Sequence, residues 1–234
     1  SFRQSMNISV KTQDRDQQNY METLNEIGLW HKTDKSTMTH CYLGVYESYL
    51  KDWREKEFTL LEIGVAAGNS LKMWREYFPK AKVYGIDINP DCAGYGEGIF
   101  IGTQTDTAFL DSVLEKIGAP DVIIDDGSHV GLDMIFTFRH LFPKMKAGGL
   151  YVVEDTHAGA YIPTYSGEPE ANGRSKAFNF FTGLVYDIDI AGKGSCGNAS
   201  FCIDHPSETP AVPEFSRILE CAFFHCSLWW FKRR

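Results

Sequence analysis

Short apolar runs alternate with amphipathic segments through the middle of the chain. These runs and segments predict, in order, strands and helices at residues 58–63, 69–78, 82–87, 98–102, 107–117, 121–125, 130–142 and 150–153. Runs that stay apolar at consecutive positions are typical of strands buried on both faces of a parallel sheet. Their regular alternation with helices predicts an α/β fold whose mostly parallel sheet is doubly wound in the Rossmann-like manner.

The N-terminal part of the chain has a different pattern. Apolar residues recur at helical spacing in 16–30 and 41–54, and a polar link over residues 30–35 separates the two predicted helices. We therefore expect an N-terminal helical segment over 1–56 that packs on a main domain over 57–234. The chain length of 234 residues and its 43% hydrophobic content suit one sizeable domain with such an appendage.

The C-terminal third is looser and then closes with strands. Residues 157–175 and 191–213 are rich in glycine, proline and serine and predict long loops on either side of a helix at 176–190. Loops of that length in a compact domain are usually lids or binding loops. The apolar runs 218–224 and 228–231 predict an antiparallel hairpin that completes a seven-stranded sheet.

Charge and composition exclude several classes of protein. The net charge is −8, and an acidic surface argues against nucleic acid as a partner because phosphate binding needs a basic face. No apolar run approaches the roughly 20 residues that a membrane span needs, and the first residues do not form a signal peptide. Six cysteines without a C-x-x-C pair make a zinc knuckle unexpected, and we favour a reduced, cytoplasmic protein.

A glycine turn joins the first predicted strand to its helix. Glu62 ends the strand, Gly64 and Gly68 follow, and Asp87 ends the next strand 25 residues after Glu62. An acid at the end of the second strand can bind ribose hydroxyls. The turn lacks the glycine spacing of dinucleotide enzymes and the Gly-Lys-Ser/Thr of a P-loop. Because Glu62 is a poor neighbour for a pyrophosphate, the turn favours the cationic S-adenosylmethionine over NAD.

Acidic side chains gather at the carboxyl ends of the predicted strands, which is where open α/β sheets bind ligands. They are Glu62, Asp87, Asp106, Asp125, Asp126, Glu154 and Asp155. Seven carboxylates repel one another unless a cation or a cationic ligand lies among them. Asp126, Glu154 and Asp155 would offer three hard oxygen ligands to Mg²⁺. His129 follows Asp126 by three residues and could take a proton from a metal-bound hydroxyl. The alternative is an aspartate-rich turn in which Ser128 or Asp126 only caps the next helix.

Several of these motifs together resemble a known family. They are the segment 61–78 with Leu-Glu-Ile-Gly, Gly-Ile-Asp-Ile at 85–88, Asp-Asp-Gly-Ser-His at 125–129 and Val-Val-Glu-Asp at 152–155. The chain resembles the class I S-adenosylmethionine-dependent methyltransferases. Within them it is similar to the metal-dependent sugar O-methyltransferases of macrolide biosynthesis, of the mycinamicin and macrocin type. Residues 28–156 carry most of the resemblance, including Thr33-Asp34-Lys35 with His40 and Tyr42 before the core. Residues 215–232 carry it loosely, and 157–213 align with nothing in that family.

The resemblance implies a fold, two cofactors and a set of roles. Mg²⁺ would bind Asp126, Glu154 and Asp155, and His129 would act as the general base. The residues expected at the S-adenosylmethionine site are Glu62, Gly64, Gly68, Ser70, Asp87, Gln104, Asp106 and Asp125. The acceptor would be a glycoside or a polyol, with no nucleic acid or membrane involved, and a homo-oligomer is left open because the extra N-terminal domain of some members is absent here.

Other functions fit parts of the pattern. A Mg²⁺-dependent catechol-type O-methyltransferase would share the same core. An NAD-dependent sugar oxidoreductase or epimerase would use a similar sheet, although the glycine spacing, Glu62 and the absence of a Tyr-x-x-x-Lys pair after the fifth strand argue against it. A non-catalytic domain would have no need for so many clustered carboxylates.

Overall fold

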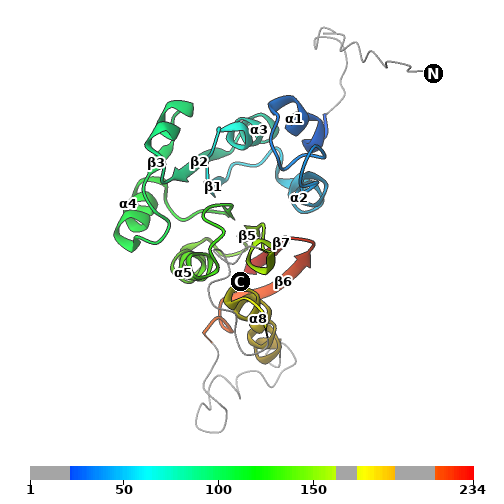
Figure 1. The fold of residues 1–234 in the computed structure, drawn as a ribbon, viewed down its shortest axis with the longest axis vertical. Helices are drawn as coiled ribbons and strands as arrows, with labels where there is room; N and C mark the ends of the chain where they lie inside the picture. Colours follow the sequence, from blue (N-terminus) through cyan, green and yellow to red (C-terminus); the bar gives the residue numbers. More distant parts are fainter. Residues whose placement is uncertain (1–21, 162–172, 193–213) are drawn as a thin grey trace, which may run out of the picture.

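A computed structural model describes residues 22–161, 173–192 and 214–234 of the chain. Its centre is a seven-stranded sheet with the order β3-β2-β1-β4-β5-β7-β6 (Figure 1). The strands are β1 (Thr59–Ile63), β2 (Lys82–Asp87), β3 (Ile99–Ile101), β4 (Val122–Asp125), β5 (Leu150–Glu154), β6 (Leu219–His225) and β7 (Leu228–Arg233). The first five strands are mutually parallel, while β7 pairs antiparallel with both β5 and β6.

Helices lie between these strands and on both sides of the sheet. The α-helices are α1 (Leu24–His31), α2 (Leu43–Leu50), α3 (Asn69–Tyr77), α4 (Thr107–Ile117), α5 (Gly131–Leu141), α6 (Ala158–Tyr161) and α8 (Lys176–Gly192). Short 3₁₀ turns are η2 (Lys51–Trp53), η3 (Pro90–Tyr95) and η4 (Phe142–Lys144). The predicted α/β fold, with its mostly parallel seven-stranded sheet and C-terminal hairpin, is therefore confirmed.

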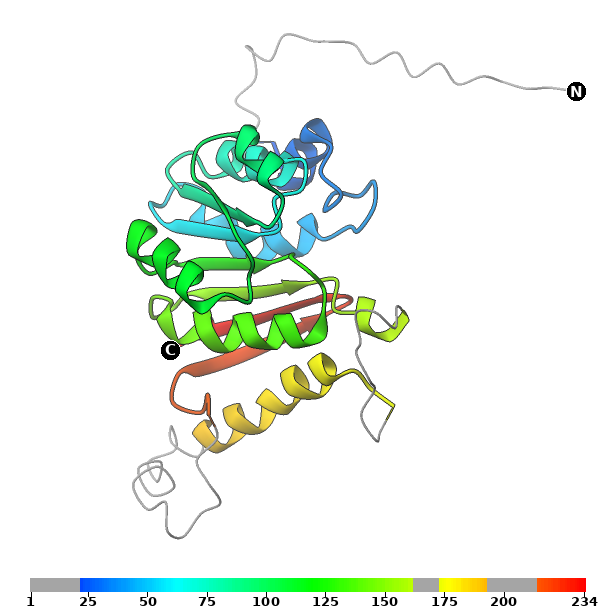
Figure 2. The same ribbon diagram turned by 60° about the vertical axis from the view of Figure 1, so that its left-hand side comes forward.

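Two hydrophobic cores cover the two faces of the sheet. Helices α1, α2 and α3 pack on one face, and α4, α5 and α8 pack on the other (Figures 1 and 2). Residues within one strand divide between the cores: on β5, Val152 faces the first, whereas Tyr151 and Val153 face the second. Side chains of a strand alternate between faces, so a strand that contributes to both cores must be apolar throughout.

The winding of the sheet creates a crevice. From β1 the chain moves outward through β2 and β3, then returns to place β4 on the other side of β1. The loops after β1 and β4 therefore leave the sheet in opposite directions, and ligands bind at such switch points. The glycine turn and the Asp-Asp-Gly-Ser-His segment are the two loops that meet there.

The structure corrects three boundaries. The first helix begins at Leu24, because the side chains of Thr23 and Glu26 form a capping box; residues 16–21 lie outside the described part. The segment predicted as a loop from residue 157 opens with α6, where the Ala158 amide donates to the Asp155 carbonyl over 2.9 Å. Helix α8 continues to Gly192, so the second predicted loop starts later, and most of both loops lies outside the described residues.

Candidate functional site

The turn after β1 is shaped by Gly64 and Asp87. Gly64 has φ +94°, and a Cβ built on it would lie 2.0 Å from the Asp126 carbonyl oxygen, so only glycine lets the β1 and β4 loops touch. The Asp87 carboxylate accepts from the amides of Val65 and Ala66 over 2.8 and 3.0 Å. Burial raises the pKa of Asp87, but backbone donation from Asn89, Ala66 and Val65 outweighs it and holds the pKa below its usual value.

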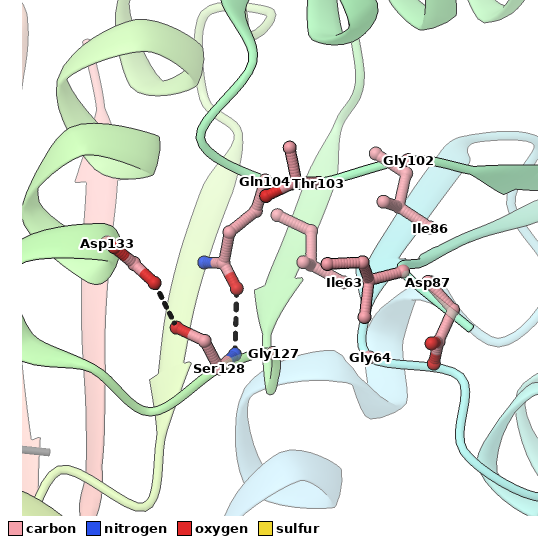
Figure 3. Close-up of a pocket in the computed structure, with 11 residues that line it drawn as sticks. Ile63, Gly64, Ile86, Asp87, Gly102, Thr103, Gln104, Gly127, Ser128 and Asp133 are labelled. Atoms are coloured by element: carbon pink, nitrogen blue, oxygen red, sulfur yellow. Dashed lines mark hydrogen bonds between the residues drawn. The ribbon is translucent and has the colours of Figure 1, made fainter. Parts of the chain in front are cut away.

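A pocket of about 190 Å³ lies on one side of Gly64 (Figure 3). Its lining consists of Ile63, Gly64, Ile86, Asp87, Ile88, Gly102, Thr103, Gln104, Gly127, Ser128 and Asp133. Gln104 accepts from the Ser128 amide over 2.7 Å, and the Ser128 hydroxyl donates to Asp133 over 2.8 Å. Gln104 also donates to the buried Asp125 over 3.1 Å. The result is a slot with apolar walls and a fixed polar rim.

A second pocket, of about 160 Å³, lies on the other side of Gly64. The glycine turn forms one wall of it, and the segment after α1 forms the opposite wall. Its lining consists of Lys32, Thr33, Asp34, Gly64, Val65, Ala66, Ala67, Asn69, Ser70 and Asp126. Gly64 and the loop after β4 therefore border both spaces, and Asp126 is the strand-end carboxylate that lines the second one.

Lys35 is the cation among these carboxylates. Its Nζ donates to Asp126, lies 2.9 Å from Glu154 Oε2 and 3.2 Å from Glu62 Oε1, and its side chain is only 1% exposed. The Ser70 hydroxyl donates to the other Glu62 oxygen over 2.9 Å. The polar link predicted at residues 30–35 begins at the end of α1, and its Lys35 is buried against the strand ends.

Burial governs the charges of this group. It raises the pKa of Glu62 to about 7 even though Lys35 lowers it, and raises that of Asp125 to about 7 against hydrogen bonds from Tyr151 and Gln104. Burial and the neighbouring Asp126 raise the pKa of Glu154 well above its usual range. Burial lowers the pKa of Lys35, but attraction to Asp126, Glu154 and Glu62 outweighs burial and raises the pKa well above its usual value. This lysine therefore stays charged. The cation expected among the acids is thus in part a side chain of the protein itself.

Asp126, His129 and Asp155 form a group that could hold a metal ion. One ligand atom from each lies within 4.8 Å of the others, and His129 Nε2 is 3.9 Å from Asp126 Oδ1 and 4.0 Å from Asp155 Oδ2. Two carboxylate oxygens and an imidazole nitrogen suit a divalent cation. His129 and Asp155 have φ of 56° and 51°, a left-handed conformation that is uncommon outside glycine and often found at functional sites.

The remaining predicted residues have identifiable partners. Glu154 lies beside the metal-capable group, but both of its oxygens are engaged, one by Tyr46 and the other by Lys35. Asp106 caps α4 by accepting from the amides of Ala108 and Phe109, and it lines neither pocket. Gly68 is the left-handed N-cap of α3. Asp125 accepts from Tyr151 over 3.0 Å beneath the first pocket. The cofactor and metal roles of these residues stay predictions.

Sequence reasoning assigned no role in the site to Lys35, Tyr42 or Tyr46. The excess of acids called for a cation, but nothing in the spacing distinguishes Lys35 from the neighbouring Lys32. The two tyrosines carried a signal, because residues four apart lie on one face of a helix.

Within the described part of the chain, no helix combines the length and the apolar character needed to cross a bilayer.

Comparison with known proteins identifies the relatives of this chain, although no family model matches it. The 8-demethyl-8-alpha-L-rhamnosyl tetracenomycin-C 2'-O-methyltransferase of Streptomyces olivaceus is 36% identical over 220 residues, which are 89% of this chain and 54% of that protein. The mycinamicin VI 2''-O-methyltransferase of Micromonospora griseorubida is 35% identical over 157 residues, 63% of this chain and 39% of that protein. The homologues of this chain are sugar O-methyltransferases.

The fold agrees with that of a sugar O-methyltransferase. The MycE methyltransferase of the mycinamycin biosynthetic pathway, in complex with Mg and SAH, matches with a TM-score of 0.74 at 28% identity, over 92% of this chain and 54% of that one. Its complex with Mg, SAH and mycinamycin VI matches with a TM-score of 0.72 at 27% identity, over 91% of this chain and 54% of that one. The resemblance inferred from the sequence is confirmed, and the chain spans about half the length of these relatives.

Proposed function

We propose that this protein is an S-adenosylmethionine-dependent, Mg²⁺-dependent O-methyltransferase that acts on a sugar hydroxyl of a glycosylated natural product. The observation that carries the proposal is the position of the two pockets on either side of Gly64, the second of which ends at Asp126 beside His129 and Asp155. A cofactor that crosses Gly64 would have its reactive end next to a metal-capable group.

The two pockets differ in a way that suits the two ends of S-adenosylmethionine. The first has apolar walls for a flat base, and the Asp87 carboxylate on its rim, ionised because its pKa is lowered, would accept from ribose hydroxyls. The second borders Asp126 and Ser70, and Ser70 in turn holds Glu62. Carboxylates there favour the cationic methionine end, and this end supplies the methyl group.

The carboxylates and His129 would perform the second half of the chemistry. Asp126 and Asp155, with Glu154 beside them, would hold Mg²⁺, a Lewis acid that lowers the pKa of a hydroxyl. In this proposal His129 is not a metal ligand; its Nε2, 3.9 Å from Asp126 Oδ1, would take the proton of the acceptor hydroxyl. Base catalysis of this kind contributes about 10²–10⁴-fold to the rate. Positioning of the two reactants would contribute up to about 7–11 kcal/mol.

The names of the relatives describe methyl transfer to sugar hydroxyls, which favours a sugar acceptor over a catechol and methyl transfer over hydride chemistry. A small-molecule glycoside as partner belongs to the same proposal. Cytoplasmic location and assembly into a homo-oligomer stay predictions.

The test is a turnover assay with S-adenosylmethionine against glycosides and catechols, with Mg²⁺ and with a chelator. We expect methyl transfer to a glycoside that the chelator abolishes. His129→Ala should keep cofactor binding and lose about 10²–10⁴-fold in kcat. His140→Ala is a matched control, because His140 pairs with Asp111 over 2.9 Å and lines neither of the two pockets at Gly64. Normal turnover in His129→Ala would remove the base assignment, and full activity in chelator would remove the metal.

A further inference from the structure

The segment between α1 and the middle of α2 contributes three buried polar side chains that contact the two carboxylates of the metal-capable group and the adjacent Glu154. Lys35 contacts Asp126, while the hydroxyls of Tyr42 and Tyr46 contact Asp155 and Glu154, respectively. We propose that Lys35, Tyr42 and Tyr46 are positioning residues that set the orientation of the metal-binding carboxylates. This inference rests on the proposed function and assigns a role to a segment that sequence analysis interpreted as an appendage.

Tyr46 is held by packing and aimed by its hydroxyl. The side chain is fully buried, and its ring lies 5.1 Å from that of Trp74 and 4.9 Å from that of Trp230. The two rings restrict the orientation of the phenol, and its hydroxyl donates to Glu154 Oε1 over 2.5 Å. A hydroxyl in a layer otherwise made of aromatic and aliphatic groups needs a partner, and here the partner is a carboxylate.

Tyr42 lies one helical turn before Tyr46 and therefore on the same face of the helix. Its hydroxyl donates to Asp155 Oδ1 over 2.5 Å, and the residue is 4% exposed. The His40 ring stacks on the Tyr42 ring with centroids 5.2 Å apart, and this contact restricts the phenol further. The second oxygen of Asp155 faces His129, so Tyr42 occupies the side of the carboxylate that points away from the metal-capable group.

Lys35 performs the same task for Asp126. Its ammonium donates a hydrogen bond to Asp126 Oδ2, and the other oxygen of Asp126 faces His129. The Lys35 carbonyl accepts from the amides of Tyr42 and Leu43 over 2.9 and 3.3 Å, which ties this loop to the start of α2. Lys35, Tyr42 and Tyr46 thus belong to one hydrogen-bonded segment. Removing any outer partner of a metal ligand typically costs about 10–100-fold in metal affinity.

The chain offers a matched control on the same helix. The Tyr49 hydroxyl lies 2.9 Å from His225 Nε2, and its ring packs on Trp230 at 4.7 Å and Phe223 at 5.1 Å. Tyr49→Phe removes the hydrogen bond of a half-buried phenol without touching a carboxylate of the site. A role in stability alone would affect Tyr42→Phe, Tyr46→Phe and Tyr49→Phe in the same way.

The experiment measures Mn²⁺ binding to the full chain by electron paramagnetic resonance and SAH binding by calorimetry. We expect Tyr42→Phe and Tyr46→Phe to bind Mn²⁺ about 10–100-fold more weakly, and Tyr49→Phe to match wild type within twofold. SAH affinity without metal should stay within twofold for Tyr42→Phe. Circular dichroism checks that each variant is folded. The tyrosine variants keep their rings, and Lys35 is left unchanged because removing its positive charge would itself favour a cation at Asp126.

Each result has one meaning. Wild-type Mn²⁺ affinity in both Tyr42→Phe and Tyr46→Phe overturns the positioning role and leaves the proposed function intact. Equal losses in all three tyrosine variants also overturn it, because the effect would then be general destabilisation. A wild-type chain that transfers methyl groups but binds no Mn²⁺ removes the metal from the proposed function and this inference with it.

Discussion

Gly64→Ala tests whether the contact between the β1 and β4 loops creates the cofactor site. A Cβ at residue 64 would lie 2.0 Å from the Asp126 carbonyl oxygen, about 1 Å closer than real Cβ atoms approach backbone, so one loop must move by that amount. The φ of +94° adds about 1–2 kcal/mol of backbone strain for a residue with a side chain. Both pockets share Gly64, so the displacement alters both of them.

Gly118→Ala separates the two costs. Gly118 also has positive φ, +78°, but a Cβ there meets nothing within 4 Å, and the residue ends α4 away from both pockets. Urea unfolding should show a loss of about 1–3 kcal/mol for Gly118→Ala with unchanged SAH affinity by calorimetry. Gly64→Ala should lose more stability, and a 1 Å displacement can cost about 100-fold in function. Equal stabilities of the two variants, with normal SAH binding by Gly64→Ala, would refute the reasoning.

Two further substitutions test Asp87 at the rim of the first pocket and Phe138 in the hydrophobic core on the α5 side of the sheet. Because the pKa of Asp87 is lowered from 3.8 in the folded chain, its stabilising effect is complete above that value and is lost as the pH falls through the lower folded value. The difference in unfolding free energy between wild type and Asp87→Asn should be constant near neutrality and shrink below about pH 4; a difference that widens there would contradict this sign. Phe138→Ala should cost about 3–5 kcal/mol in urea unfolding, because the fully buried ring packs on Phe142 at 4.7 Å and Tyr151 at 5.0 Å. A loss below 1 kcal/mol would show that the core collapses around the missing ring.

The sequence was sufficient for the sheet because its strands are buried on both faces. Runs such as Val122 to Asp125 are apolar at nearly every position, and that pattern has one common explanation. The order of the loops then placed Gly64, Asp87 and Asp126 at one edge. The hairpin followed from its two apolar runs, which pair as expected through β6 and β7.

The details of the site depended on contacts between distant segments. No local pattern marks Lys35 as buried, because its environment comes from Glu62, Asp126 and Glu154 on other strands. The sequence also does not indicate which way the Glu154 carboxylate points, since both of its hydrogen-bond partners lie more than 100 positions earlier in the chain. Sequence position identified the acids, but the direction of each carboxylate is a property of the packed structure.

The contact between Lys35 and Glu154 joins residues 119 positions apart. Closing so long a loop costs chain entropy that local helix contacts do not, so such pairs tend to form late in folding. During synthesis, Lys35 can contact Glu154 only after the ribosome has released β5. Any chain cut short of that strand would leave Lys35 without Glu154, and the candidate site would lack one of its acids.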